Sequence, residues 1–191
     1  MTSVNRGPAA ARGNRAALLA SARRLFAEQG YAVPLTVVAK DAGVGQGSLY
    51  RHFPTREDLA AAVVSESMAT LTRLVADHPG PEAFGVLWHT VVDDLVDSVG
   101  FLDAALGPRG EIGGSSPGAE LAALLAEPLA RARAEGTVPP DLTADDVMLV
   151  LTMLHGAVHR EPDPRTRRET AYRALALVGR GLALAQPPAT S

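Results

Sequence analysis

The spacing of apolar positions along the chain predicts helices from one end to the other. Over residues 15–29, apolar side chains recur three, four and seven positions apart, which places them on one face of an α-helix. Asn14 can cap the start of this helix, and Gly30 can end it in the left-handed backbone conformation. Residues 1–14 are rich in Pro, Gly, Ala and Arg without periodicity, and we expect them to form a mobile arm.

Two short helices are predicted next, over residues 35–42 and 46–53. Pro34 suits the first turn of the earlier helix because its missing N–H is not needed there. Gly43 can end that helix tightly, and Pro54 terminates the later one because it supplies no amide hydrogen.

The remainder of the chain continues the helical pattern. Thr55 and Asp58 resemble a capping box for a long helix to about residue 77, and Thr143 can cap a nearly apolar helix. Because no useful strand alternation or internal repeat occurs, the predicted fold class is all-α. The other expected segments are helices over residues 81–99, 101–106, 119–135, from the Thr143 cap to 159 and from after 164 to about 185, a Gly-, Pro- and Ser-rich loop over 107–118, and a disordered tail over 186–191.

The composition is that of a globular protein. Hydrophobic residues make up 47% of the chain and charged residues 20%, which is unlike a disordered chain. There is no cysteine, so disulfide and thiolate chemistry are excluded. No uninterrupted apolar run reaches the roughly 18 residues of a membrane span, and the first residues lack a secretory signal. We therefore expect a cytoplasmic protein without membrane contact.

Charge is unevenly distributed along the chain. Residues 1–60 carry eight basic and four acidic side chains, whereas residues 61–191 carry ten basic and seventeen acidic ones. A basic first third on an acidic body suggests a module that faces a polyanion, although chance asymmetry is common at this size.

Residues 35–53 have the pattern of a helix-turn-helix, in which the second helix enters the major groove of DNA. Ala39 is small where the helices would cross, Gly43 can supply a positive φ, and Val44 can fill the core. Leu49 and Phe53 are four positions apart and are predicted to point inward. The residues left for solvent or DNA are Gln46, Ser48, Tyr50, Arg51 and His52.

This region resembles the TetR/AcrR family of regulators. The resemblance covers about the first third of the chain. It implies an operator-binding domain over residues 15–54, a ligand-binding and dimerisation domain over 55–185, a homodimer, a palindromic operator, a small-molecule effector and usually repression. It is carried by Leu25-Phe26, Glu28, Gly30-Tyr31, Ala42-Gly43-Val44, Gly47-Ser48-Leu49-Tyr50, His52-Phe53, Arg56-Glu57 and Leu59.

The resemblance also implies roles for individual residues. Gln46, Gly47 and Ser48 would lie nearest the base edges, where Gln46 can pair with adenine and Gly47 permits close approach. Tyr50 and His52 match positions that contact phosphates. Further DNA contacts are expected from Thr36 and Lys40 on the preceding helix and from Arg56, which replaces the usual lysine and could hold a phosphate at the start of the long helix.

Two residues depart from the family pattern. Pro34 stands where a capping Ser or Thr is common, and Gly45 stands where the recognition helix often begins with Ser. Each loses a hydroxyl, so those two contacts are not carried over.

An effector needs an apolar cavity with a few polar groups in the larger domain. Trp88 and His89 are the leading candidates because an aromatic wall and a hydrogen-bonding group stand side by side, although an ordinary bundle core would account for the apolar members. The full candidate set is Met68, Leu71, Phe84, Trp88, His89, Val92, Phe101 and Met153.

The last two long helices are expected to form the dimer interface, as a four-helix bundle with the partner. Small residues at Gly156, Gly179 and Gly181 would let helices approach closely, although the same stripes could be monomer interior. The expected apolar stripes comprise Val147, Val150, Leu151, Leu154 and Val158 on one helix and Leu175, Val178, Leu182 and Ala185 on the other.

Nothing in the sequence points to catalysis, a cofactor or a metal centre. His155 and His159 are four positions apart, but no nearby Glu completes a metalloprotease motif. Gly43, Gly45 and Gly47 imitate a phosphate loop without its strand or its Gly-Lys-Ser/Thr ending. Two alternatives stay open: a helical enzyme or metal protein, and a ligand-binding module that has lost DNA binding.

Overall fold

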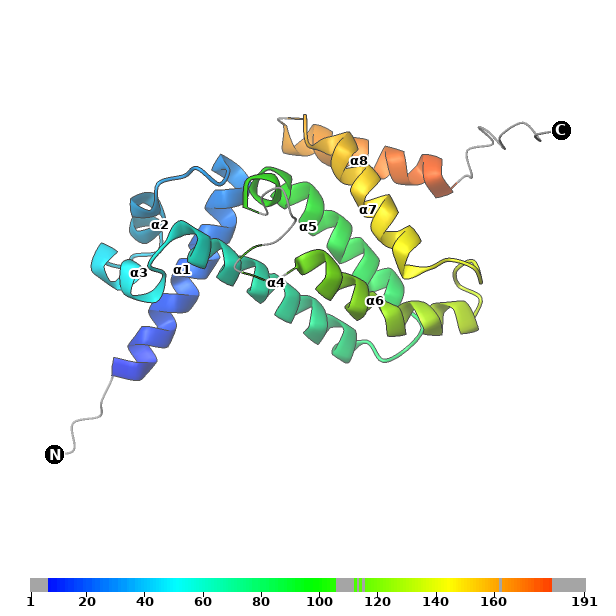
Figure 1. Ribbon diagram of the computed structural model, residues 1–191, viewed down its shortest axis with the longest axis horizontal. Coiled ribbons are helices and arrows are strands. Elements are labelled where there is room, and N and C mark those ends of the chain that lie inside the picture. The colour runs from blue at the N-terminus through cyan, green and yellow to red at the C-terminus, as the bar shows by residue number, and fades with distance from the viewer. Residues whose placement is uncertain (1–6, 106–111, 113, 115, 162, 180–191) are drawn as a thin grey trace.

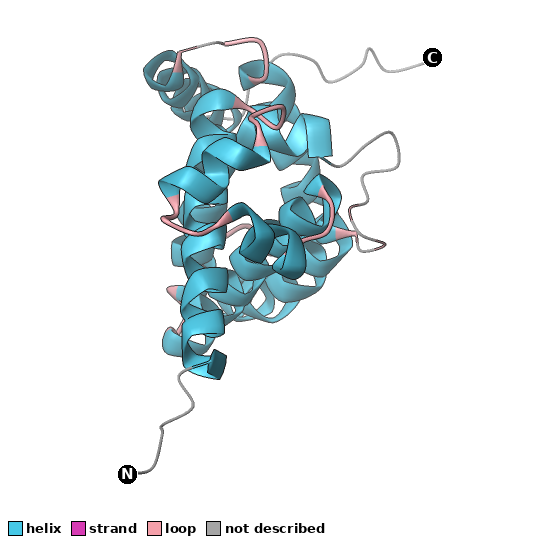
Figure 2. Ribbon diagram, turned by 90° about the vertical axis from the view of Figure 1, so that its left-hand side faces the viewer, coloured by secondary structure: helices cyan, strands magenta, loops and turns pink. Residues whose placement is uncertain are grey.

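The computed structural model describes residues 7–105, 112, 114, 116–161 and 163–179. Within these residues the chain forms eight helices, which confirms the all-α fold class (Figures 1 and 2). They are α1 (Gly7–Gln29), α2 (Leu35–Asp41), α3 (Gln46–His52), α4 (Arg56–Asp77), α5 (Ala83–Ala105), α6 (Pro117–Ala134), α7 (Ala144–Val158) and α8 (Pro164–Gly179).

One hydrophobic core holds α1, α2, α3 and the first half of α4 together. Leu18 and Phe26 of α1 are fully buried, as are Val38 of α2 and Leu49 of α3. Because α2 and α3 have only seven residues each, packing against α1 rather than intrinsic helix stability must fix their positions. This unit lies at one end of the elongated molecule (Figure 1).

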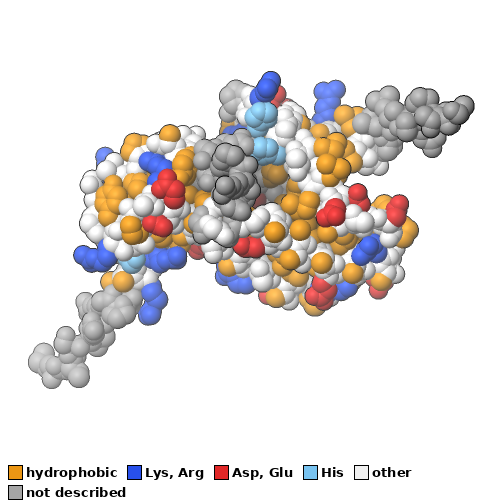
Figure 3. All heavy atoms as spheres, in the orientation of Figure 1, with side chains coloured by type: hydrophobic (Ala, Val, Ile, Leu, Met, Phe, Trp, Pro, Cys, Tyr) orange, Lys and Arg blue, Asp and Glu red, His pale blue; other side chains and the backbone are white. Residues whose placement is uncertain are grey.

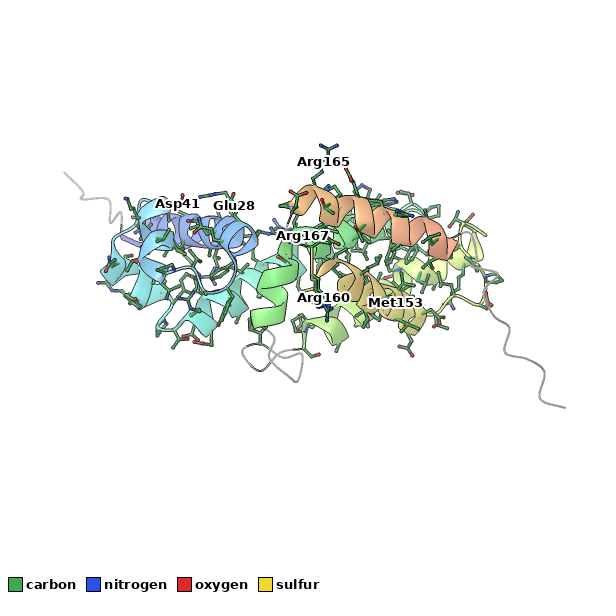
Figure 4. All side chains as sticks on the ribbon, turned by 90° about the horizontal axis from the view of Figure 1, so that it is seen from above. Glu28, Asp41, Met153, Arg160, Arg165 and Arg167 are labelled. Atoms are coloured by element: carbon green, nitrogen blue, oxygen red, sulfur yellow. The ribbon has the colours of Figure 1, made fainter. Side chains whose placement is uncertain are left out.

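A second core lies among α4, α5, α6 and α7. Leu87, Leu125 and Leu154 are almost completely buried there, and Leu71 brings in the second half of α4. The last helix, α8, packs on α5 and α7. Buried Arg167 of α8 donates from Nη1 to the Val96 carbonyl of α5 at 3.1 Å, between the two helices (Figure 4).

Side-chain caps mark the starts of α4 and α7. Thr55 accepts from the backbone N–H of Asp58, whose carboxylate accepts from the backbone N–H of Thr55. Thr143 and Asp146 make the same reciprocal pair at α7. The bond from Thr143 lowers the pKa of Asp146. The predicted caps are therefore present at both helices.

Two helices differ from the sequence-based expectation. The first helix begins at Gly7 instead of residue 15, so the expected arm over residues 7–14 is wrong. Pro8 is compatible with a first helical turn, and the following alanines favour helix strongly even without an apolar stripe. The fifth helix runs on through Gly100 to Ala105, so the expected break there is also wrong, because one Gly weakens a helix without ending it.

The other boundaries lie within two residues of those expected wherever the structure describes them. In the predicted loop over 107–118, Ile112 is buried in the first core and α6 begins at Pro117. The predicted tail over 186–191 lies outside the described residues, as do Leu182 and Ala185.

Within the described residues, α4 is long and apolar enough, by length and composition alone, to cross a membrane. Its Leu59, Val63 and Leu71 are buried against neighbouring helices, and its first turn carries Glu57 and Asp58. These contacts are those of a core helix shared by both halves of the fold.

Candidate nucleic-acid interface and effector cavity

Helices α2 and α3 meet through a tight turn. Gly43 has a φ of +65°, the left-handed conformation that favours glycine. The N–H of Val44 then donates to the Ala39 carbonyl at 2.9 Å, while both side chains are buried. Neither Pro34 nor Gly45 provides a side-chain cap for the helix that follows it. The turn therefore fixes the angle between α2 and α3 through backbone geometry and packing.

The expected DNA-contacting residues share one property: their side chains reach the surface. Tyr50 is 47% exposed, which is unusual for a large aromatic side chain, whereas Leu49 beside it is 1% exposed. Helix α3 thus divides into one buried and one exposed face. Thr36, Lys40, Gln46, Gly47, Tyr50 and Arg51 are exposed, and Ser48, His52 and Arg56 are half-buried.

Arg56 is placed differently from the expectation. Its Nη1 donates to the carbonyls of Tyr31 at 2.5 Å and of Val33 at 2.6 Å. The guanidinium also lies 5.4 Å from the centre of the Tyr31 ring. Arg56 therefore ties the start of α4 to the loop between α1 and α2, and this Nη1 is committed to the protein rather than to a phosphate.

Arg15 is a basic residue near α3 that the motif did not single out. Its guanidinium lies 5.4 Å from the centre of the Phe53 ring, at the C-terminal end of α3. Figure 3 shows Lys and Arg side chains gathered around the first part of α1 and the adjoining α3. The sequence offers one sign of this basic surface: Arg12 and Arg15 are three positions apart, where the expected arm meets the expected helix start.

A polar clamp fastens α2 to α1. The hydroxyl of Ser21 donates to Oδ2 of Asp41 at 2.5 Å, with the Val38 carbonyl at 3.2 Å. Arg24 bridges Asp41 and Glu28, with Nη2 2.5 Å from Oδ1 of Asp41 and Nη1 2.8 Å from Oε2 of Glu28. The bonds from Ser21 and then Arg24 hold the pKa of Asp41 below its usual value.

The larger domain contains a cavity of about 220 Å³ between α1 and the helices α4–α7. Among the residues that the structure describes, its polar side chains are those of Arg23, Ser67, Asp94 and Ser98, and no aromatic side chain lines it. The apolar wall is formed by Val63, Val64, Met68, Leu71, Val91, Leu95, Pro117, Leu121, Met148 and Leu151.

Only part of the expected effector site lines this cavity. Met68 and Leu71 do so. Phe84, Trp88 and Val92 instead belong to the surrounding core and line no part of it. His89 and Met153 are exposed. Nδ1 of His89 lies 2.7 Å from the Gly85 carbonyl of its own helix, and Met153 is 54% exposed. The side chain of Phe101 lies outside the described residues.

The cavity side of α5 is one helical face away from the side that was expected. Val91, Asp94, Leu95 and Ser98 follow one another at helical spacing and line the cavity. Arg23 was also missed, because it comes from α1 and only the tertiary packing brings it to α4 and α5.

The outer face of α7 and α8 carries a set of exposed apolar side chains. Leu149 is 58% exposed and Met153, one turn later, 54% exposed. Most of the apolar stripe expected on α7 packs inside the subunit. Its buried members are Val147, Leu151, Leu154 and Val158. Tyr172, Leu177 and Val178 of α8 are also exposed, on different sides of that helix.

Comparison with known proteins shows two kinds of similarity. Residues 18–63 match the family described as "Bacterial regulatory proteins, tetR family". The HTH-type transcriptional regulator LmrA of Bacillus subtilis is 39% identical over 66 residues, which are 34% of this chain and 35% of that relative. The similarity to this curated relative thus spans about a third of its length.

Solved structures match over nearly the whole chain. A TetR transcriptional regulator from Streptomyces coelicolor is 31% identical, with a TM-score of 0.67, covering 88% of this chain and 97% of that one. A TetR transcription regulatory protein from Mycobacterium vanbaalenii is also 31% identical, with a TM-score of 0.65 and coverage of 87% and 97%. Both extend the similarity beyond the helix-turn-helix into the larger helical domain.

Proposed function

The chain belongs to the TetR family of transcriptional regulators, and on that premise we propose that it is a homodimeric repressor of a palindromic operator. A small-molecule effector in the cavity between α1 and α4–α7 releases the dimer from DNA. The sites are the exposed face of α2 and α3 for DNA, the cavity for the effector, and the outer face of α7 and α8 for the partner.

The observation that carries this proposal is the two-faced recognition helix. Leu49 anchors α3 in the core, whereas Gln46, Gly47 and Tyr50 stand exposed on its other side. Gln46 can donate to and accept from an adenine edge. Gly47 has no side chain, so the backbone of α3 can approach the major groove closely. Arg51 and Lys40 flank this surface with positive charge suited to phosphates.

Dimerisation follows from the size of the surface. One seven-residue helix reads few bases, whereas two copies about 34 Å apart read half-sites in successive major-groove turns. Leu149 and Met153, exposed one turn apart on α7, supply the apolar patch for the partner, since a two-fold dimer buries the same patch on both subunits.

Release by an effector requires preferential binding to the form of the dimer that does not fit the operator, since equal affinity for both forms shifts nothing. Helix α4 is the physical connection, because its first half packs in the DNA-binding unit and its second half lines the cavity. A change in its tilt would alter the distance between the two recognition helices.

The test is a fluorescence anisotropy titration of the full chain with upstream DNA of its own gene and with a scrambled duplex. The expected result is a sequence-preferring complex whose affinity falls steeply with salt. Arg51→Ala should weaken the complex and flatten its salt dependence, whereas the matched control Arg73→Ala, exposed in the second half of α4, should leave both unchanged. Equal affinity for the scrambled duplex would refute operator recognition.

A further inference from the structure

The cavity lies where the two hydrophobic cores of the protein meet. Val63 and Val64 on its wall belong to the first core, which holds α1, α2 and α3. Leu71, Val91 and Leu151 belong to the second core, which holds the helices of the larger domain. A molecule in this cavity therefore contacts both cores.

One end of the cavity is polar, and its central group comes from the DNA-binding unit. Arg23 of α1 donates from Nη2 to the Ser67 hydroxyl of α4 at 2.9 Å. The same Nη2 lies 3.5 Å from Oδ2 of Asp94 on α5. Because the side chains of Arg23 and Asp94 are 42% and 44% exposed, this polar end reaches solvent while the apolar wall lies deeper.

The charges at this end leave little room for a charged ligand. Burial raises the pKa of Asp94, and the negative charges of Asp97 and Asp93 raise it further. The positive charge of Arg23 lowers it. An anion that drew Arg23 away would leave Asp94 among like charges. A cation that bound Asp94 would lie close to the guanidinium of Arg23, which is 3.5 Å from that carboxylate, and the two like charges would repel each other.

From this geometry we infer that the cavity binds an uncharged aliphatic molecule of about eight carbons, whose polar head accepts from Arg23 and donates to Asp94. A primary amide or an alcohol has such a head. An apolar cavity of about 150 Å³ holds benzene, so the larger volume here has room for about nine non-hydrogen atoms. The part of the wall that the structure describes consists of Val, Leu, Met and Pro side chains, and these suit an aliphatic body because both surfaces are removed from water together.

Arg23 makes this site responsive to its ligand, and this part of the inference rests on the proposed function. A head group inserted between Arg23 and Asp94 replaces contacts that now join α1 to α4 and α5. Because α1 packs directly on α2 and α3, the replacement acts on the recognition unit without an intermediate element. We expect the occupied protein to bind its operator more weakly.

Isothermal titration of the full chain with octanamide, octanoate and octylamine at pH 7 tests the inference. These probes have the same chain length and differ only in the head. Octanamide is expected to bind at least about tenfold more tightly than either charged probe, and Arg23→Met should weaken it about tenfold by removing the charged donor. Arg73→Met is the matched control, because Arg73 lies exposed on α4 and bonds only within that helix.

A second variant keeps the result interpretable if Arg23→Met unfolds. Leu121→Trp fills the cavity from α6 and should abolish octanamide binding with helical content retained by circular dichroism. Equal affinities for the three probes, a preference for a charged one, no binding, or full binding by Leu121→Trp would overturn the inference.

Operator affinity, measured on the same samples, separates this inference from the proposed function. An operator complex without octanamide binding refutes the inference alone. Octanamide binding without any operator complex refutes the proposed function and leaves the ligand assignment standing. Octanamide binding that does not weaken an existing operator complex overturns the role of Arg23 in coupling.

Discussion

The hydroxyl of Ser21 on α1 lies 2.5 Å from Oδ2 of Asp41 on α2, and this contact joins the two helices that position the recognition helix. Ser21 is 5% exposed, so its hydroxyl is a buried polar group with a partner across the helix interface. Arg24 bonds to the other oxygen of the same carboxylate. Asp41 therefore serves as the acceptor for two residues of α1.

Replacement of Ser21 by alanine should make the protein more sensitive to acid. The bond from Ser21, followed by that from Arg24, lowers the pKa of Asp41. A carboxylate with a lowered folded-state pKa contributes stability above its unfolded pKa of about 3.9, and this stability is lost as the pH falls through the folded value. Ser21→Ala should raise the folded-state pKa and move the midpoint of acid unfolding, followed by circular dichroism, to higher pH.

The exposed Ser65 of α4 offers the control for this change, because Ser65→Ala removes a hydroxyl without a comparable carboxylate partner. An acid midpoint of Ser21→Ala equal to that of the wild type and of Ser65→Ala would show that the clamp makes no pH-dependent contribution.

Arg56→Met should lower the free energy of unfolding by about 1–2 kcal/mol. This value is near the low end for hydrogen bonds to a charged group, because the side chain of Arg56 is only half-buried. The substitution removes the donors that hold the carbonyls of Tyr31 and Val33. Urea denaturation measures the change, with Arg51→Met as the exposed control in the same unit. Unchanged stability with a large loss of DNA affinity would instead restore the phosphate-binding role first expected of Arg56.

Gln46→Ala should relax the operator preference at one base position in each half-site. Loss of a bidentate contact to a base edge costs about 1–3 kcal/mol at the preferred base and little at the others. Anisotropy titrations against duplexes substituted one base pair at a time would locate the position. Gln29→Ala, at the exposed end of α1, is the matched control. A uniform loss over all duplexes would assign Gln46 to the DNA backbone.

Leu149→Glu should weaken dimerisation by at least about tenfold, because burial of a leucine side chain is worth about 1.5–3 kcal/mol and a two-fold interface contains it twice. Light scattering after size-exclusion chromatography, over a dilution series, gives the mass. Ala69→Glu adds the same charge at an exposed position of α4 and should leave the dimer intact. A dimer that resists Leu149→Glu would place the interface elsewhere.

The helix-turn-helix was predictable because its requirements are local. Gly43 must adopt a positive φ within a few residues of chain, and Leu49 and Phe53 must share a face of one short helix. These constraints can be recognised from spacing alone. The bonds of Arg56 could not be anticipated in the same way, because its acceptors lie more than twenty residues earlier in the chain.

The lining of the cavity was less predictable because α5 is apolar on more than one side. Phe84, Trp88 and Val92 lie on a face that packs into the core, whereas Val91 and Leu95 line the cavity. Both sets have helical spacing, so periodicity cannot show which of them faces a hollow. The direction is decided by where α1, α6 and α7 pack around α5.

Helix α4 is uninterrupted from Arg56 to Asp77, and it supplies walls to two separate interiors. Unfolding of either hydrophobic core would remove the α4 contacts of the other core. We therefore expect the two halves of the subunit to unfold together. Heating should consequently produce a single calorimetric peak for the folded subunit, and anything that tightens the larger half should delay the loss of the smaller half by the same number of degrees.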